Sequence, residues 1–193
     1  MPNSLCLLHA SPRKHGNGAA ICAAIASHLA QRGFSARLVH LEAEHIHPCT
    51  ACGSCAENPG RCIYDALEGD LARQVLESIA QAPALLIVAP VWFYGPPAHL
   101  KALIDRSQLF WEQNGGPMQG PQRPAWNVLT AGRRKGERLF EAGSLILRCF
   151  ERQMGFAPKE GLELRGLDSP GDFSASAEAQ EQLKAWSAGL KWA

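Results

Sequence analysis

Strand-like and helix-like patterns alternate along the whole chain. Short apolar or alternating stretches predict strands at residues 5–8, 34–40, 84–88, 127–130 and 160–165. Apolar residues spaced three or four apart predict helices centred on residues 21–29, 71–79, 100–107, 139–154 and 183–190. Strands that alternate with helices form a parallel sheet covered on both faces. We therefore expect one α/β domain over residues 1–193, with a doubly wound, five-stranded sheet in the order 2-1-3-4-5.

Such a sheet binds ligands beyond the carboxyl ends of its strands, and three loops converge there: 10–18, 90–95 and 130–136. The first contains Ser11, Arg13, Asn17 and Gly18 and leads into a predicted helix, whose free N–H groups and dipole favour an anion. Ser11 and Asn17 can donate further hydrogen bonds, and glycine lets the backbone approach a ligand closely. The dinucleotide fingerprint would need glycine where Ile21 stands. The phosphate of a mononucleotide fits this loop, and an ordinary polar connection is the alternative.

The second loop is rich in aromatic residues and consists of Pro90, Val91, Trp92, Phe93, Tyr94 and Gly95. Its rings can stack on a flat ring system, and the backbone N–H groups between them can reach the edge of that system. A hydrophobic plug or a contact between subunits would use the same residues. The third loop begins with Thr130, Ala131 and Gly132. Its basic residues 133–135 fit a solvated turn better than a site for a nucleotide 2′-phosphate.

Composition narrows the choice of compartment and partners. The chain is 46% hydrophobic and 19% charged, with a formal net charge of +1, so nothing indicates a nucleic-acid partner. It contains no apolar run long enough to span a membrane, and its first residues do not resemble an export signal. We therefore expect a cytoplasmic protein with no membrane partner.

Four of the seven cysteines, Cys49, Cys52, Cys55 and Cys62, crowd into an irregular loop at residues 45–65. In a reducing compartment such crowding favours metal or redox chemistry over a disulfide framework. Bacterial ferredoxins use the same C-x2-C-x2-C opening to bind a cubane iron–sulfur cluster. Zinc is the second candidate, because its sites more often use two C-x2-C pairs separated by a longer loop. Free thiols or an adventitious disulfide are the third alternative.

Three motifs in this order point to a family. Residues 10–18 read ASPRKHGNG, residues 90–95 read PVWFYG and residues 100–106 read LKALIDR. With them the chain resembles the NADPH-dependent FMN reductase and iron–sulfur flavoprotein branch of the flavodoxin-like superfamily, over residues 5 to about 165. It departs from the family pattern at Ala10, which replaces a glycine. It departs again at Gly18, which replaces a threonine whose hydroxyl often contacts the phosphate.

The resemblance implies a flavodoxin-like fold, FMN as cofactor, NADH or NADPH as electron donor and a homodimer or tetramer. The phosphate would then lie on residues 11–18, with more weight on Ser11, Arg13 and Asn17. Backbone N–H groups of 93–95 would lie near flavin N5, and those of 130–132 near the pyrimidine carbonyls. The four cysteines would hold a [4Fe-4S] cluster, although relatives can keep cysteines there without one.

The expected activity is electron transfer to a flavin, quinone or iron–sulfur acceptor, which can be a small molecule or a protein. We assign no catalytic acid or base. Two other classes of function stay open at this point. One is a non-enzymatic electron carrier fed by a protein partner, and the other is a metal-stabilised interaction module without flavin.

Overall fold

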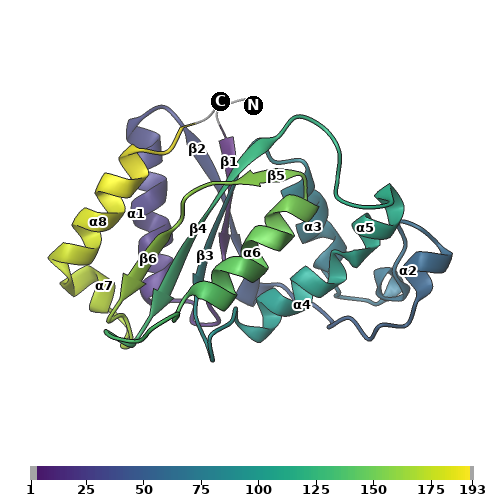
Figure 1. Cartoon of the computed structure of the whole chain (residues 1–193), viewed down its shortest axis with the longest axis horizontal. Helices are drawn as coiled ribbons and strands as arrows, with labels where there is room; N and C mark the ends of the chain where they lie inside the picture. The colour runs from purple at the N-terminus through teal and green to yellow at the C-terminus, as the bar shows by residue number, and fades with distance from the viewer. Residues whose placement is uncertain (1–3, 192–193) are drawn as a thin grey trace.

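Six parallel strands form one sheet in the computed structural model, which describes residues 4–191 (Figure 1). The strands are β1 (Ser4–His9), β2 (Ser35–His40), β3 (Leu85–Pro90), β4 (Arg123–Ala131), β5 (Phe156–Pro158) and β6 (Leu162–Arg165). Their order is β2-β1-β3-β4-β5, with β6 also paired to β4. This confirms the predicted doubly wound, flavodoxin-like α/β fold. The outer limits of the expected domain, residues 1 and 193, lie outside the described part of the chain.

The last position of the sheet is more complex than the single strand expected at 160–165. β5 pairs with the first residues of β4, and β6 pairs with its last residues, so two short strands share one edge. Pro158 ends β5, and proline cannot donate to a strand ladder. Gly161, three residues later, lies so close to Asn127 that a Cβ atom at this position would be 2.6 Å from Oδ1 of Asn127. The break between β5 and β6 therefore has a local cause.

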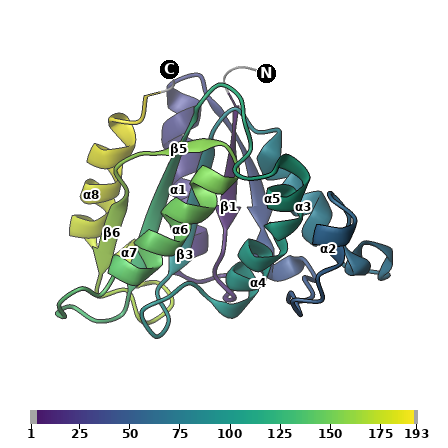
Figure 2. The same ribbon diagram turned by 45° about the vertical axis from the view of Figure 1, so that its right-hand side comes forward.

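Helices cover both faces of the sheet (Figures 1 and 2). The α-helices are α1 (Asn17–Gln31), α2 (Ser54–Glu57), α3 (Ala72–Ala80), α4 (Ala98–Arg106), α5 (Gln108–Asn114), α6 (Glu141–Gln153), α7 (Asp172–Ala175) and α8 (Ala177–Ala188). Two short 3-10 helices are η1 (Leu41–Ala43) and η2 (Ile63–Ala66). α1, α7 and α8 lie on one face, and α3, α4 and α6 lie on the other. None of the helices in the described residues is long and apolar enough to cross a membrane.

Alternate residues of the central strands feed two separate hydrophobic layers. Leu5 and Leu7 of β1 pack with α1 and α8, whereas Cys6 and Leu8 pack with the helices of the opposite face. All four side chains are buried. Because both faces of β1 are covered, the strand is apolar at nearly every position, as the run at 5–8 predicted.

The fold brings the polar loops to one edge of the sheet. The loops after β1, β3, β4 and β6 all leave the carboxyl ends of their strands, at the bottom of Figure 1. The segment between β2 and α3 carries the clustered cysteines and extends away from the sheet to lie beside α5. Two candidate sites follow from this layout, one at the carboxyl edge and one against α5.

Candidate functional site

A small cavity of about 100 Å³ opens at the carboxyl edge of the sheet. It is lined by Ser11, Arg13, Asn17, Gly18, Pro90, Val91, Trp92, Thr130, Ala131, Gly132, Leu167 and Asp168. Backbone hydrogen bonds link these loops: the Val91 N–H donates to the Thr130 carbonyl at 2.7 Å, and the Leu167 N–H donates to the Ala131 carbonyl at 3.0 Å. The three loops expected to converge therefore do so, together with the loop that follows β6.

The beginning of α1 forms one wall of this cavity. Gly16 is the N-cap residue, no side chain caps the helix, and its first turn contains no acidic residue. The first N–H groups of a helix have no acceptor within the helix, so this end favours an anion. The Ser11 hydroxyl accepts a hydrogen bond from the Arg13 N–H at 3.1 Å, which leaves its own proton to donate. One guanidinium nitrogen of Arg13 donates to the Asp168 carbonyl at 2.7 Å, and its remaining N–H groups are available to a ligand.

The Asn17 side chain holds the loop after β6 in place. Its amide nitrogen donates to the Ser169 carbonyl at 3.0 Å, and its amide oxygen accepts from the Phe173 N–H at 3.1 Å. Asn17 therefore joins the first turn of α1 to the 169–173 segment. Its amide is already engaged at both ends, which leaves Ser11, Arg13 and the backbone as the freer donors in this cavity.

The aromatic residues form a tight turn at the rim. Trp92 and Gly95 exchange two backbone hydrogen bonds of 2.9 and 3.0 Å across the turn. Its two central residues, Phe93 and Tyr94, have φ angles of 49° and 66°, which are unfavourable for side chains with a Cβ atom. Phe93 is fully exposed, and Trp92 and Tyr94 are about half exposed. Phe93, Tyr94 and Gly95 thus stand beside the cavity rather than in its wall, with aromatic surface open to a ligand or a neighbouring subunit.

The clustered cysteines line a second, larger cavity of about 490 Å³ against α5. Cys49 and Cys52 are exposed, Cys55 and Cys62 are half-buried, and all four are free thiols. Burial raises the pKa of Cys55, and the nearby charges of Glu112, Cys49 and Cys62 raise it further. The fold therefore brings Cys55 within electrostatic reach of Cys49 and Cys62.

The sulfur atoms of this cavity already receive backbone hydrogen bonds. The Ala51 N–H donates to Sγ of Cys49 at 3.4 Å, and the Asp65 N–H donates to the Cys62 side chain. Hydrogen bonds of this kind tune the thiolate ligands of iron–sulfur clusters. A tetrahedral zinc ion with Zn–S bonds of about 2.3 Å would bring its sulfurs within roughly 3.8 Å of one another. Among the described residues no three cysteine sulfurs lie within 4.8 Å of each other, so the thiols are not gathered closely enough here for a single zinc ion.

Sequence comparison places the chain in a family. The sequence profile of a family described as NADPH-dependent FMN reductase matches residues 4–159, which is most of the chain. The protein belongs to the NADPH-dependent FMN reductase family.

The sequence is also similar to proteins named iron–sulfur flavoproteins, including the following two. The protein from Methanosarcina thermophila is 35% identical over 54% of this chain and 52% of its own length. One from Archaeoglobus fulgidus is 29% identical over 78% of this chain and 70% of its own length. The chain therefore spans about half the length of the first of these relatives. Among solved structures, an NAD(P)H:quinone oxidoreductase from Methanothermobacter marburgensis has a TM-score of 0.72, with 18% identity over 97% of this chain and 98% of that one. At this identity the similarity shows the shared fold.

The structure gives a reason for one departure from the family pattern. A Cβ atom at Gly18 would lie 2.9 Å from Nε2 of His9 and 3.3 Å from Cβ of Ser11. Because the His9 ring fills this space, this member of the FMN reductase family has no room for the threonine usual at position 18. The sequence resemblance marked the substitution without explaining it.

Sequence reasoning missed two residues of the cavity, Leu167 and Asp168. A Cβ atom at Gly132 would lie 2.7 Å from Oδ1 of Asp168, so the loop after β6 packs closely on the loop after β4. The missed residues directly follow a predicted strand. The rule that placed three loops at the carboxyl edge therefore also applied to them.

Proposed function

We propose that the protein binds FMN at the carboxyl edge and uses it to pass electrons from NADH or NADPH to an acceptor. The observation that carries this proposal is the cavity at the uncapped N-terminus of α1, lined by the predicted phosphate loop and by both partner loops. Membership of the NADPH-dependent FMN reductase family over residues 4–159 supports the same reading. FMN, when bound, supplies the hydride and electron chemistry, and the protein supplies binding and orientation.

The size of the cavity indicates how FMN would lie. A volume of about 100 Å³ is well below the roughly 300–1,000 Å³ of sites that enclose a whole cofactor-sized ligand. It suits the phosphate end, with the Ser11 hydroxyl, Arg13 and the first N–H groups of α1 as donors. The flat ring system would then lie against the exposed turn at residues 92–95. There the aromatic faces can cover it, and backbone groups can reach its edge.

Asp168 extends the proposed site. The main chain of residues 130–132 would face the pyrimidine end of the flavin. The Asp168 carboxylate lies against Gly132, where it can accept a hydrogen bond from a ring N–H. We assign no side chain of the described residues to proton transfer.

The half-exposed and fully exposed rings at the rim also fit the expected homodimer or tetramer. Trp92, Phe93 and Tyr94 leave a large aromatic surface in water in the single chain. Exposed aromatic clusters commonly mark contact sites. A second subunit that packs against this turn would exclude water from one side of the flavin.

We further propose that Cys49, Cys52, Cys55 and Cys62 hold a [4Fe-4S] cluster, which supplies one-electron storage when bound. The fit rests on two features of the cysteine cavity: its volume, and the N–H groups that point at two of its sulfurs. The names of two relatives are consistent with this proposal. With a cluster present, the electron acceptor would be a protein that takes one electron at a time, such as an iron–sulfur protein. Without a cluster, the acceptor would be a flavin or a quinone.

The deciding experiment titrates the flavin-free protein with FMN, riboflavin and FAD, and then mixes the FMN form with NADPH and NADH without oxygen. We expect FMN to bind far more tightly than riboflavin, because riboflavin lacks the phosphate. Loss of the flavin absorbance near ~450 nm on the timescale of catalytic turnover would support the proposed reductase activity. Equal binding of riboflavin would contradict the phosphate position. Failure of both nucleotides to reduce the flavin would favour an electron carrier that is fed by a protein partner.

A further inference from the structure

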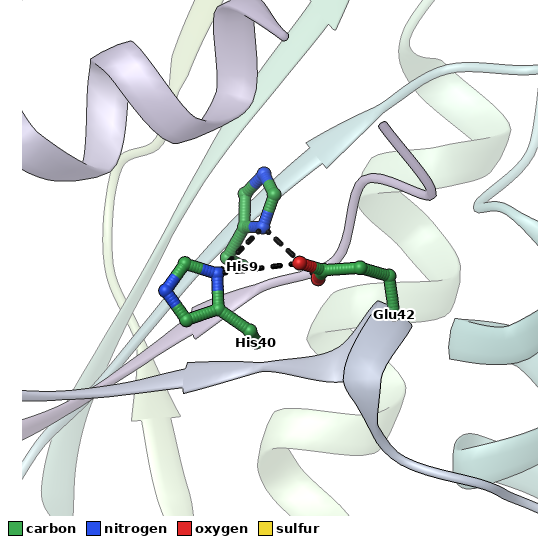
Figure 3. A group of neighbouring side chains, drawn as sticks. All are labelled: His9, His40 and Glu42. Atoms are coloured by element: carbon green, nitrogen blue, oxygen red, sulfur yellow. Dashed lines mark hydrogen bonds and ion pairs between the residues drawn. The ribbon is translucent and has the colours of Figure 1, made fainter. Parts of the chain in front are cut away.

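Three side chains that neither cavity uses meet at the carboxyl ends of β1 and β2. His9 is the last residue of β1, His40 is the last residue of β2, and Glu42 follows in η1. The parallel register places His9 directly beside His40. Figure 3 shows the Nδ1 atoms of both rings and the Glu42 carboxylate pointing toward one another.

Both Nδ1 atoms and one Glu42 oxygen lie within 4.8 Å of one another, close to the ligand spacing of a tetrahedral metal ion. Nδ1 of His9 lies 3.3 Å from Oε2 of Glu42 and 3.4 Å from Nδ1 of His40. Nδ1 of His40 lies 3.4 Å from Oε1 of Glu42. A zinc ion with bonds of about 2.0–2.1 Å to nitrogen and oxygen separates its ligands by roughly 3.3–3.4 Å. Among the described residues, this is the one group of three or more His, Cys, Asp or Glu side chains that is so close together.

Hydrogen bonds alone cannot satisfy all three contacts. If both Nδ1 atoms carry protons and donate to Glu42, the two N–H groups face each other at 3.4 Å. If one ring accepts from the other instead, its lone pair faces the carboxylate. Oε1 of Glu42 is buried and makes no hydrogen bond. A cation that all three atoms ligate removes the conflict, because each atom then directs a lone pair at the ion.

Burial and access also suit an ion. His9 is fully buried, the Glu42 side chain is 11% exposed and the His40 side chain is 42% exposed, so the group opens to solvent on the His40 side.

We propose that His9, His40 and Glu42 bind a divalent transition-metal ion of the zinc class, with water in the fourth position on the open side. Two imidazoles and one carboxylate are a common donor set for such ions. The ion would join the ends of β1 and β2 below the loop at residues 10–18, since Nε2 of His9 lies against Gly18. The three residues line neither of the two cavities, although His9 packs against Gly18 in the wall of the carboxyl-edge cavity.

The test must separate this site from the cysteines. Chelator-treated protein is alkylated with iodoacetamide to block thiols, then titrated with ZnCl2, and the zinc ligands are identified by X-ray absorption. We expect about one zinc per chain, bound by nitrogen and oxygen at about 2.0 Å and not by sulfur at about 2.3 Å. We also expect a higher melting temperature with zinc, because an ion that binds only the folded state stabilises it.

Variants assign the ligands. His40→Gln and Glu42→Gln should each weaken zinc binding at least roughly tenfold, since loss of even an outer-shell partner can cost that much. His45→Gln is the matched control, because its side chain is exposed and lies close by in the sequence. Circular dichroism checks that each variant is folded. The proposal is wrong if alkylation removes all zinc binding, or if folded His40→Gln and Glu42→Gln bind zinc as the parent protein does.

Discussion

Arg106 and Asp70 form a two-pronged ion pair that is almost completely buried. The two guanidinium nitrogens lie 2.9 and 3.1 Å from the carboxylate oxygens, and each side chain is 1% exposed. Asp70 also accepts the His47 N–H at 2.8 Å, and Arg106 donates to the His47 carbonyl at 2.9 Å. Burial opposes ionisation of Asp70, but these hydrogen bonds outweigh it and hold its pKa below the usual value. Through Asp70 and the His47 backbone, Arg106 thus fastens the end of α4 to both ends of the segment that carries the cysteines.

We expect Arg106→Met to lower the free energy of unfolding by about 3–5 kcal/mol, because the buried Asp70 carboxylate would lose its charge partner. Lys101→Met is the matched control on the same helix. Its ion pair with Asp105 is exposed and should contribute at most about 1 kcal/mol. Urea denaturation measures both changes.

The same Arg106→Met variant should loosen the cysteine segment. We expect thiol reagents to modify half-buried Cys55 and Cys62 faster than in the parent protein, under conditions where the variant is still folded. Parent-like stability and parent-like thiol reactivity would together contradict the anchoring role of the ion pair.

Arg13 should contribute to the binding of the phosphate group rather than of the ring system. We expect Arg13→Ala to weaken FMN binding by roughly tenfold to a hundredfold, the size expected for a hydrogen bond to a charged group. Its effect on riboflavin should be small, because riboflavin has no phosphate. Lys14→Ala is the control, since Lys14 is also exposed and does not line the cavity. Flavin fluorescence titration separates these cases, and equal losses for FMN and riboflavin would place Arg13 elsewhere.

We expect Phe93, in the turn at residues 92–95, to contribute to flavin binding at the cost of backbone strain. Phe93 has a φ angle of 49° and a fully exposed side chain, so Phe93→Gly removes strain without removing packing. We expect the free energy of unfolding to stay level or rise by up to about 1 kcal/mol. Flavin affinity or the rate of reduction by NADPH should fall. A variant with lower stability and unchanged flavin chemistry would show that Phe93 has a structural role instead.

The sequence was sufficient for the sheet order and for most of the cavity at the carboxyl edge. Buried parallel strands such as 84–88 are recognisable as apolar runs, and the carboxyl-edge rule then places Ser11, Val91 and Thr130 together. The short strand β5 was not predicted, because the three residues Phe156–Pro158 carry no periodic pattern. Local pattern alone is too weak for elements of this length.

The group of His9, His40 and Glu42 shows a different limit. The two histidines are 31 positions apart, and only the β1–β2 register makes them neighbours. In the sequence each looks like an isolated histidine. By contrast, the cysteines lie within 14 consecutive residues, 49–62, so their proximity could be predicted from spacing alone. Sites built from strand ends depend on how two strands far apart in the sequence pair with each other, which the local pattern of either strand does not show.

Glu151 should make stability depend on pH. The residue is fully buried on α6, and burial raises its pKa from 4.5 to about 7 against the opposing hydrogen bond from Asn127. Between these values the unfolded chain releases the proton while the folded chain keeps it. Stability should therefore fall as pH rises through this window and level off above it, by on the order of 3 kcal/mol. Urea denaturation from pH 5 to pH 8 should show this loss in the parent protein and not in Glu151→Gln. Parallel pH profiles for the two proteins would refute the assignment.

The proposed iron–sulfur cluster requires the four clustered cysteines but not Cys149, and this difference can be tested. Cys149 on α6 is also an exposed free thiol, but it does not line the cysteine cavity. After anaerobic purification we expect about four irons and matching sulfide per chain in the parent protein and in Cys149→Ser.

Replacing a cluster cysteine should remove the iron, because serine does not supply the thiolate that an iron–sulfur centre needs. We therefore expect Cys52→Ser or Cys55→Ser to lose most iron and sulfide while keeping FMN, since the two cavities share no lining residue. Iron and sulfide analysis beside flavin absorbance measures both centres in one sample. If the parent protein contains full FMN and no iron, the cysteines belong to a loop without a cluster and the acceptor is a flavin or quinone. If iron survives every single substitution in the quartet and is lost with Cys149→Ser, the ligands have been misassigned.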